Sequence, residues 1–293
     1  MGIKVNNLVM EYKKGIKSLD HINLSIDHGI YGLLGENGAG KTTLMKILVT
    51  LLAPTAGTAE INGMTVERKI YEKIKKQIGY LPRDFGLYPN LTVRESLEYV
   101  GIMSGMEKED CRKQIDLYLE LTGLAEHQRK KNRQLSGGMK RRVGLVQALL
   151  HNPSILIVDE PTTGLDPEER IRIRNLLVDF SSERTVLFST HVTEDLAATC
   201  DKLCILRKGQ VVYDGRMNKL ISMAENHVFS RSFQNEMDFQ KFQREYKITS
   251  KIYEANSIEV RFVSETIPVF PCNRCNPNLE DAYIYSLYGK ARK

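Results

Sequence analysis

The stretch GENGAGKTT, residues 35–43, has the residue types and spacing that hold nucleotide phosphates. It fits the pattern G-x-x-x-x-G-K-[ST] at Gly35, Gly40, Lys41 and Thr42. The glycines let backbone N–H groups wrap a β-phosphate, because a Cβ atom would block that approach. The pattern predicts that Lys41 bridges the β- and γ-phosphates and that the Thr42 hydroxyl binds Mg²⁺.

Two adjacent carboxylates in ILIVDEP supply the acidic half of such a site. Asp159 follows four aliphatic residues, which is where P-loop enzymes place a carboxylate that holds Mg²⁺. Glu160 stands beside it and can polarise an attacking water as a general base. His191 follows the run LFST and has two interpretations, a hydrogen bond to a γ-phosphate or a purely structural role. These residues predict hydrolysis of a nucleoside triphosphate.

A second glycine-rich turn, LSGGM, stands at residues 135–139, directly before a helix-forming run. Ser136 offers a hydroxyl, and Gly137 and Gly138 offer backbone N–H groups at a helix start, which favours a bound phosphate. The chain thus has two phosphate cradles but one full set of catalytic residues.

Short aliphatic runs that alternate with helical stretches predict a mostly parallel sheet covered by helices. The predicted elements are buried strands at 29–35, 154–160 and 185–190, and a helix at 42–52. Gly35, Asp159, Glu160 and His191 then fall at strand ends or one step past them. Ligands bind at this edge of such sheets.

From about residue 88 to 151 the pattern turns helical, and Thr92 and Glu95 have the spacing of a capping box. A hairpin-like stretch at 206–215 precedes a region that predicts strand, helix, strand and strand over 227–264. A final helix begins at Leu279. The sequence therefore predicts an α/β domain over 1–215 and a small α+β region over 216–293.

The bulk properties place the chain among ordinary globular proteins. It has 293 residues and a formal net charge of +6 that is spread along the sequence. No apolar run approaches the ~18 residues of a spanning helix, and no signal segment is visible. Five cysteines, an odd number, favour reduced thiols in the cytosol.

In this order, GENGAGKTT, LSGGMKRR, ILIVDEPTTGLD and STH resemble the nucleotide-binding subunit of an ABC transporter. The resemblance covers nearly all of 1–215 and implies an ABC-type ATPase with the P-loop NTPase fold. It implies a helical subdomain at about 88–151 and the cofactors ATP and Mg²⁺, the metal on Thr42 and Asp159. In that family two such domains pair head to tail, so the LSGG turn of one closes on the ATP of the other.

The resemblance also implies roles for individual residues. Lys41, Glu160 and His191 would be catalytic. The residues implied to contact ATP in the same chain are Tyr12, Gly35, Glu36, Asn37, Gly38, Ala39, Gly40, Lys41, Thr42 and Thr43. Among them, Thr43 would contact the α-phosphate and Tyr12 would stack on the adenine ring, or else pack against a sheet edge. The residues implied to reach a partner's nucleotide are Ser136, Gly137, Gly138 and Asp166, of which Asp166 is also a predicted helix N-cap before Pro167.

The tail NPNLEDAYIYSLYG, residues 276–289, resembles the C-terminus of stand-alone ATPase subunits of drug, bacteriocin and lipid exporters of the ABC-2 type. This implies two partners, an integral membrane permease and a second ABC ATPase subunit that is either an identical copy or a related paralogue. It also implies a cytoplasmic location on the inner face of the cell membrane. The alternative is a soluble, non-transport ABC ATPase that acts on ribosomes, DNA or cofactor assembly. No nucleic-acid partner is expected, because the basic run at 127–133 lacks interleaved aromatic residues.

One segment departs from the family pattern. IGYLPRDFGLYPNLTV, residues 78–93, resembles the family's glutamine loop, but Arg83 stands where the glutamine belongs. Arginine has only donors and a fixed charge, so Arg83 cannot ligate a metal. Three interpretations remain for this coupling loop: Arg83 pairs with the γ-phosphate, Arg83 binds the permease, or Asp84 supplies the missing oxygen.

Overall fold

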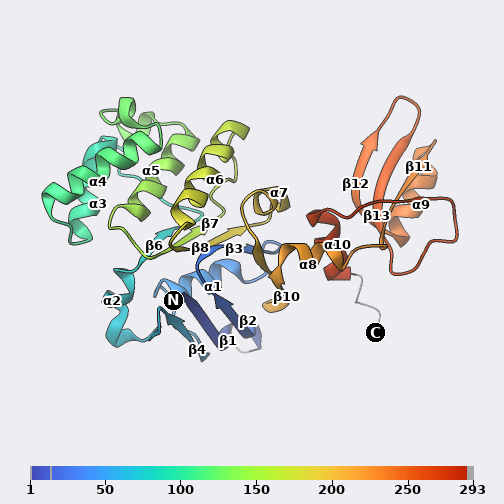
Figure 1. Cartoon of the computed structure of the whole chain (residues 1–293), viewed down its shortest axis with the longest axis horizontal. Helices are drawn as coiled ribbons and strands as arrows, with labels where there is room; N and C mark the ends of the chain where they lie inside the picture. Colours follow the sequence, from blue (N-terminus) through green and yellow to red (C-terminus); the bar gives the residue numbers. More distant parts are fainter. Residues whose placement is uncertain (1, 14, 289–293) are drawn as a thin grey trace. The chain divides into compact units, whose positions relative to one another are not determined.

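The computed structural model describes residues 2–13 and 15–288. The chain divides into two compact units, whose helices and strands are labelled in Figure 1. The first comprises Met1–Cys200 with Leu206–Val211, and the second comprises Asp201–Ile205 with Val212–Lys293. The assignment of residues 1–215 and 216–293 as two functional domains stays a prediction.

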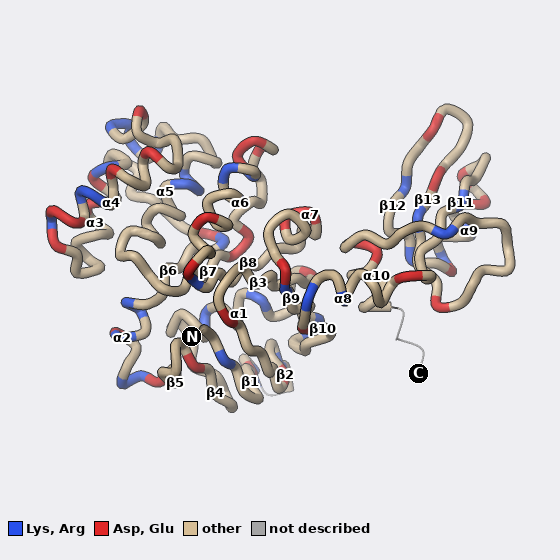
Figure 2. Tube along the Cα trace, in the orientation of Figure 1, with Lys and Arg blue, Asp and Glu red and all other residues tan. Residues whose placement is uncertain are grey.

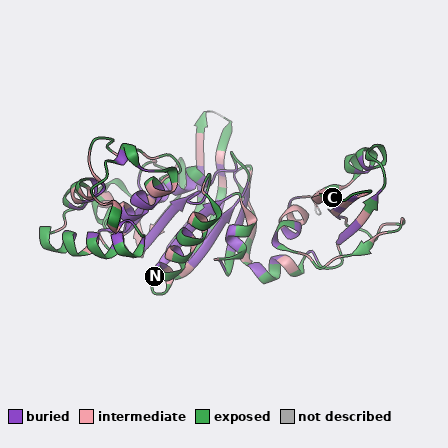
Figure 3. Cartoon of the chain, turned by 90° about the horizontal axis from the view of Figure 1, so that it is seen from above, coloured by how far each residue is buried: buried purple, intermediate pink, exposed green. Residues whose placement is uncertain are grey.

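A six-stranded sheet contains the strands predicted from the aliphatic runs. In spatial order its strands are β10 (Gln210–Arg216), β9 (Lys202–Arg207), β3 (Gly29–Leu34), β8 (Thr185–Thr190), β7 (Ile155–Asp159) and β6 (Ile78–Leu81). The pairs from β3 to β6 are parallel, as expected. Every residue of β7 and β8 is buried, and Figure 3 shows this burial along the strands. Burial on both faces explains why these strands are uninterrupted apolar or small-polar runs in the sequence.

The helices of the first unit are α1 (Lys41–Leu48), α2 (Tyr71–Lys75), α3 (Val93–Met103), α4 (Lys108–Leu121), α5 (Gly137–Leu149), α6 (Pro167–Ser181) and α7 (Thr193–Ala197). The predicted capping box of α3 is confirmed. Thr92 Oγ1 accepts a hydrogen bond from the Glu95 amide at 3.2 Å, and Glu95 Oε2 accepts one from the Thr92 amide at 2.8 Å. Charges of both signs are interspersed on α3 and α4 (Figure 2). Within the described residues, no helix is both long and apolar enough to cross a membrane.

The helix predicted at 42–52 is shorter in the structure and ends at Leu48. Thr50 has a left-handed φ of 66°, which stops the helical path. The amide of Leu51 then returns to the carbonyl oxygen of Lys46 at 2.8 Å, a common way to close a helix C-terminus. The apolar pattern therefore continued past the real end of the helix.

An antiparallel sheet near the N-terminus departs from the mostly parallel arrangement expected for this part of the chain. Its strands, in spatial order, are β2 (Ile16–Ile26), β1 (Ile3–Lys13), β4 (Ala56–Ile61) and β5 (Met64–Thr65). The pairing of β1 with β2 shifts register between Val5 and Leu8 and again toward Lys13. Such irregularities break the alternation of apolar and polar residues that identifies a half-buried strand. The expected parallel arrangement is confirmed for the central sheet and wrong here.

The second unit has the order of elements predicted for 227–264. Its antiparallel sheet has the spatial order β12 (Lys247–Tyr253), β13 (Ile258–Val263), β11 (Val228–Phe233) and β14 (Asn273–Arg274). Its helices are α8 (Met217–Ser222), α9 (Glu236–Glu245) and α10 (Leu279–Tyr288). The last helix begins at Leu279 as predicted, and Gly289 of the tail motif lies outside the described residues.

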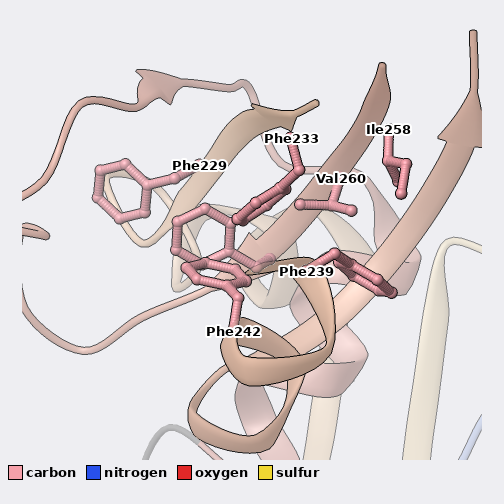
Figure 4. Close-up of a cluster of buried hydrophobic side chains, with 7 residues drawn as sticks. Phe229, Phe233, Phe239, Phe242, Ile258 and Val260 are labelled. Atoms are coloured by element: carbon pink, nitrogen blue, oxygen red, sulfur yellow. The ribbon is translucent and has the colours of Figure 1, made fainter. Parts of the chain in front are cut away.

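Phenylalanines fill the core between α9 and this sheet. Phe229 and Phe233 come from β11, and Phe239 and Phe242 come from α9 (Figure 4). The ring of Phe242 lies 5.0 Å from that of Phe233 and 4.8 Å from that of Phe262, centroid to centroid. All members of the cluster belong to the second unit, so this unit has a core of its own.

A buried carboxylate joins α10 to the same sheet. Asp281 is fully buried and accepts hydrogen bonds from Thr249 Oγ1 and Arg261 Nη2, both at 2.5 Å, and from the Asn278 amide at 3.0 Å. Asn278 Oδ1 in turn accepts from the Asp281 amide at 2.8 Å. The two residues therefore cap the start of α10 reciprocally, while the carboxylate holds β12 and β13.

We expect Asp281→Ala to destabilise the second unit by about 3 kcal/mol, because Arg261 and Thr249 lose their buried acceptor. Hydrogen–deuterium exchange should become faster in β12, β13 and α10 and stay unchanged in β7 and β8. Glu265→Ala is the matched control, because its carboxylate is exposed and lies outside the network. Wild-type exchange rates in the Asp281 variant would contradict this assignment.

Candidate active site

The glycine-rich loop lies between β3 and α1, which is the strand–loop–helix context predicted for it. Gly40 has a φ of 110°, a conformation that favours glycine. A Cβ atom on Gly40 would lie 2.6 Å from the carbonyl oxygen of Ser18, and one on Gly35 would lie 2.5 Å from that of Leu206. The close approach of neighbouring backbone therefore requires glycine at both positions.

The loop borders a cavity of about 210 Å³. The predicted contact residues that line it are Glu36, Asn37, Gly38, Ala39, Gly40, Lys41, Thr42 and Thr43, and the other lining residues are Ser18, Arg83 and Glu160. Lys41 Nζ donates to the carbonyl oxygens of Gly35 at 2.5 Å and Glu36 at 3.2 Å. Burial lowers the pKa of Lys41, and the nearby carboxylates of Glu160 and Asp159 oppose that shift. A phosphate beside Nζ would favour the charged ammonium for the same reason.

Asp159 ends β7 and is fully buried beside the loop. Its Oδ2 accepts a hydrogen bond from Thr42 Oγ1 at 2.8 Å, and its Oδ1 accepts one from Ser189 Oγ. The structure thus brings together the hydroxyl and the carboxylate that the sequence predicted as metal ligands. Both are hard oxygen donors, the kind that Mg²⁺ prefers.

Glu160, the next residue, is almost completely buried and has an unusual φ of 48°. Its Oε1 lies 3.1 Å from His191 Nδ1. Its Oε2 accepts a hydrogen bond from Thr163 Oγ1 at 3.2 Å and lies 3.6 Å from Arg83 Nε. A left-handed conformation outside glycine is costly and is concentrated at functional sites. The backbone at the end of β7 therefore directs this carboxylate toward the cavity.

Arg83 follows β6 and approaches the cavity, whereas Asp84 does not. Arg83 Nη1 donates to Asn37 Oδ1 at 3.4 Å, and Nε faces Glu160. Asp84 is exposed and lines a neighbouring cavity of about 500 Å³, whose wall also includes Arg83, Glu160 and Gly137. Of the two residues singled out in the coupling loop, the arginine is the one beside the phosphate loop.

Arg141 is a central residue that the sequence did not reveal. It lies on α5 within the basic run KRR, which looks solvent-exposed, yet its side chain is buried. Its guanidinium donates to four backbone carbonyl oxygens: Pro82 at 2.8 Å, Arg83 at 2.9 Å, Pro161 at 3.2 Å and Asp159 at 2.5 Å. Burial lowers the pKa of Arg141 to about 10, so the group stays charged near pH 7. This one side chain joins the segments that carry Arg83 and Glu160.

The second glycine-rich turn starts α5, as predicted. Ser136 is the N-cap, and its Oγ accepts from the Met139 amide at 3.2 Å. Ser136 and Gly137 are exposed, and the turn does not line the phosphate-loop cavity of its own chain. Asp166 is the N-cap of α6 before Pro167, but its side chain makes no capping hydrogen bond and is exposed.

Tyr12 and Thr43 lie together at the start of α1. The Tyr12 hydroxyl is 3.3 Å from Thr43 Oγ1, which is 2.8 Å from Ser18 Oγ. The tyrosine ring is about half exposed on β1. The ring is therefore open to a stacking partner next to the loop, and its role stays a prediction, as do the roles of the other site residues.

Comparison with known proteins gives consistent similarities. A family model described as ABC transporter matches residues 19–163. An uncharacterized ABC transporter ATP-binding protein of Bacillus subtilis (strain 168), YxlF, is 36% identical over 239 residues, 80% of this chain and 78% of that protein. The bacitracin transport ATP-binding protein BcrA of Bacillus licheniformis is 31% identical and covers 98% of this chain and 97% of its own length.

Among solved structures, a dimeric ATP-binding cassette in a post-hydrolysis state bound to ADP and Pi is similar, with a TM-score of 0.67 and 29% identity. The match covers 73% of this chain and 98% of that one. The similarity therefore extends over the whole length of a cassette that has bound hydrolysis products.

We expect Arg141→Lys to lower the rate of ATP hydrolysis about tenfold and the free energy of unfolding by about 2–3 kcal/mol. A lysine ammonium cannot reach all four carbonyl oxygens, so buried acceptors lose partners and Glu160 loses its fixed position. Steady-state phosphate release and urea unfolding measure the two effects.

Arg142→Lys is the matched control, because the neighbouring buried Arg142 bonds to Thr122 and Glu169 instead. It should lose stability and keep its hydrolysis rate. Equal hydrolysis rates in the two folded variants would refute the role of Arg141 in fixing the position of Glu160.

Proposed function

The chain belongs to the ABC transporter family as an ATP-binding subunit with the P-loop ATPase fold, and from this premise we propose that it drives a separate membrane permease. The family membership confirms the resemblance carried by the four motifs.

The position of Glu160 carries the proposed mechanism. Its carboxylate lies on the wall of the phosphate-loop cavity, and its Oε1 is 3.1 Å from His191 Nδ1. A water at this wall attacks the γ-phosphorus of ATP, and Glu160 accepts a proton from that water. The bond between the γ-phosphorus and the bridging oxygen breaks, which gives ADP and inorganic phosphate. Lys41 balances the charge of the β- and γ-phosphates, and His191 orients Glu160.

Thr42 and Asp159 are the residues that would hold Mg²⁺. Their oxygens lie 2.8 Å apart, and Mg²⁺ in phosphate-transfer sites keeps only one or two protein ligands beside waters and phosphate oxygens. When bound, the ion supplies positive charge to the phosphates. Ser189 keeps the Asp159 carboxylate oriented through its hydrogen bond to Oδ1.

The second glycine-rich turn supports pairing with another ATPase subunit. Ser136 and Gly137 are exposed and do not line the cavity of their own chain, and Asp166 is also exposed. In a head-to-tail pair, Ser136, the two glycines and Asp166 would face the nucleotide of the partner. The partner is a second copy of this chain or a related paralogue, and the ADP-bound relative described above is itself dimeric.

The extent of the similarity to the bacitracin transport protein supports a role in transport. It favours this role over an action on ribosomes, DNA or cofactor assembly. The bacitracin transport protein is similar over nearly all of both chains, including the accessory region 216–293. The tail motif also favours the exporter branch. We therefore place the chain on the inner face of the cell membrane, where a permease would select the cargo.

Glu160→Gln is expected to lower phosphate release at least ~100-fold, because the amide keeps the shape but cannot accept the proton. ATP binding should persist, and ATP should then hold the subunits together, which light scattering after size-exclusion chromatography detects. Glu168→Gln, an exposed change in the first turn of α6, is the matched control. Phosphate release at the wild-type rate would exclude Glu160 as the base.

Purification of the tagged chain from gently solubilised membranes tests the permease. A stoichiometric membrane protein in the purified complex is the expected result. If the chain is recovered only with ribosomes, DNA or assembly factors, its assignment as an ATPase still holds and the transport role is overturned.

A further inference from the structure

We propose that Asp195 is a positioning residue for ATP hydrolysis: its buried carboxylate ties the turn after Glu160 to the helix after His191 and thereby fixes the contact between those two side chains. This inference rests on the proposed function. Asp195 does not line the phosphate-loop cavity, so it acts through the residues that it holds.

Three segments of the chain meet at the Asp195 carboxylate. The residue lies on α7 and is fully buried. Its Oδ2 accepts a hydrogen bond from Thr162 Oγ1 at 2.5 Å, in the turn that follows β7. Its Oδ1 accepts from two arginines of α6, Arg170 Nη2 at 3.0 Å and Arg174 Nη1 at 3.4 Å. Both helices lie beside β8 (Figure 1), so the carboxylate joins the turn after β7 to α6 and α7.

The contact between Thr162 and Asp195 runs next to the contact between the proposed base and its histidine. Thr162 is two residues after Glu160, and Asp195 is four residues after His191. Glu160 Oε1 in turn lies 3.1 Å from His191 Nδ1. The same two segments therefore meet at two points, and a change at the first point alters the distance at the second.

His191 needs support of this kind because packing alone does not hold its ring. The side chain is 42% exposed. Its place is set by the backbone on either side, which leaves β8 through a turn in which the Val192 amide donates to Thr190 Oγ1 at 2.9 Å. The chain then enters α7, whose buried residues are Asp195 and Leu196. Asp195 therefore anchors the far side of the segment that carries the histidine.

The other oxygen of Glu160 depends on the same anchor. Its Oε2 accepts a hydrogen bond from Thr163 Oγ1 at 3.2 Å. Thr163 directly follows Thr162, whose side chain is almost completely buried and bonded to Asp195. Asp195 thus holds the partners of both carboxylate oxygens, Thr163 through the turn and His191 through α7.

The energetics of buried charge favour a positioning role over a purely stabilising one. A buried ion pair contributes little net stability, because desolvation offsets the attraction, and apolar residues of similar volume often serve as well. An apolar side chain at Asp195 cannot offer two acceptor oxygens on opposite sides, one toward Thr162 and one toward Arg170. The directed hydrogen bonds are what the carboxylate adds.

The test is Thr162→Val, which removes the hydroxyl that bonds to Asp195 and keeps the size of the side chain. We expect kcat for phosphate release to fall about tenfold and KM for ATP to stay within about twofold, because Glu160 is less well held while the phosphate loop is unchanged. Thr162→Ser keeps the hydroxyl and should stay close to the wild type. Asp195→Ala removes the acceptor and should be at least as slow as Thr162→Val. Rates are expressed per ADP-binding site, counted by isothermal titration calorimetry, so a loss of folded protein does not lower them.

Thr249→Val is the matched control. Its hydroxyl also donates to a fully buried aspartate, Asp281, at 2.5 Å, but in the second unit. It should keep the wild-type kcat. Wild-type kcat in Thr162→Val or Asp195→Ala, or an equal loss in Thr162→Ser or Thr249→Val, would overturn the inference.

A crystal structure of Thr162→Val provides the second readout. The distance between Glu160 Oε1 and His191 Nδ1 should lengthen beyond hydrogen-bonding range, and an unchanged distance would mean that Asp195 serves folding alone. The proposed function fails separately, if Glu160→Gln hydrolyses ATP at the wild-type rate. A slow Glu160→Gln beside an unimpaired Thr162→Val overturns this inference and leaves the proposed function standing.

Discussion

The site depends on one buried guanidinium. Arg141 satisfies carbonyl oxygens of Pro82 and Arg83 before it in the sequence and of Asp159 and Pro161 after it. A buried carbonyl without a partner costs about 1–3 kcal/mol, so this side chain adds to the pairing of β6 with β7 in holding the three segments together. The arrangement fixes the distance between the coupling loop and the end of β7. The position of Glu160 against Arg83 is a consequence of that shared donor.

The polar groups around the phosphate-loop cavity are bonded to one another. Lys41 binds the loop's own carbonyl oxygens, Thr42 binds Asp159, and Arg83 and His191 bind Glu160. These contacts satisfy buried polar groups, so a ligand that displaces one of them has to offer a replacement partner. The contacts of Arg83, at 3.4 Å to Asn37 and 3.6 Å to Glu160, are the longest of this set.

Local sequence patterns predicted those parts of the molecule that local chemistry determines. The phosphate loop, the carboxylates at the end of β7, the capping box of α3 and the start of α10 all follow from short motifs. The N-terminal sheet did not, because register shifts along β1 remove the period of two. The role of Arg141 was hidden for another reason. Its acceptors lie far from it in sequence, and a basic run next to a glycine turn is usually a solvated surface.

The accessory unit shows how a family motif can arise from folding alone. In NPNLEDAY, Asn278 and Asp281 bond reciprocally, and Asp281 also binds Arg261 and Thr249 on the sheet. These contacts explain Asn278 and Asp281 of the motif without any ligand, since both have partners within the unit. The tail therefore reports which accessory fold follows the ATPase. The contacts of Asn278 and Asp281 thus account for these two motif residues through the folding of the second unit, with no chemistry directed at a cargo.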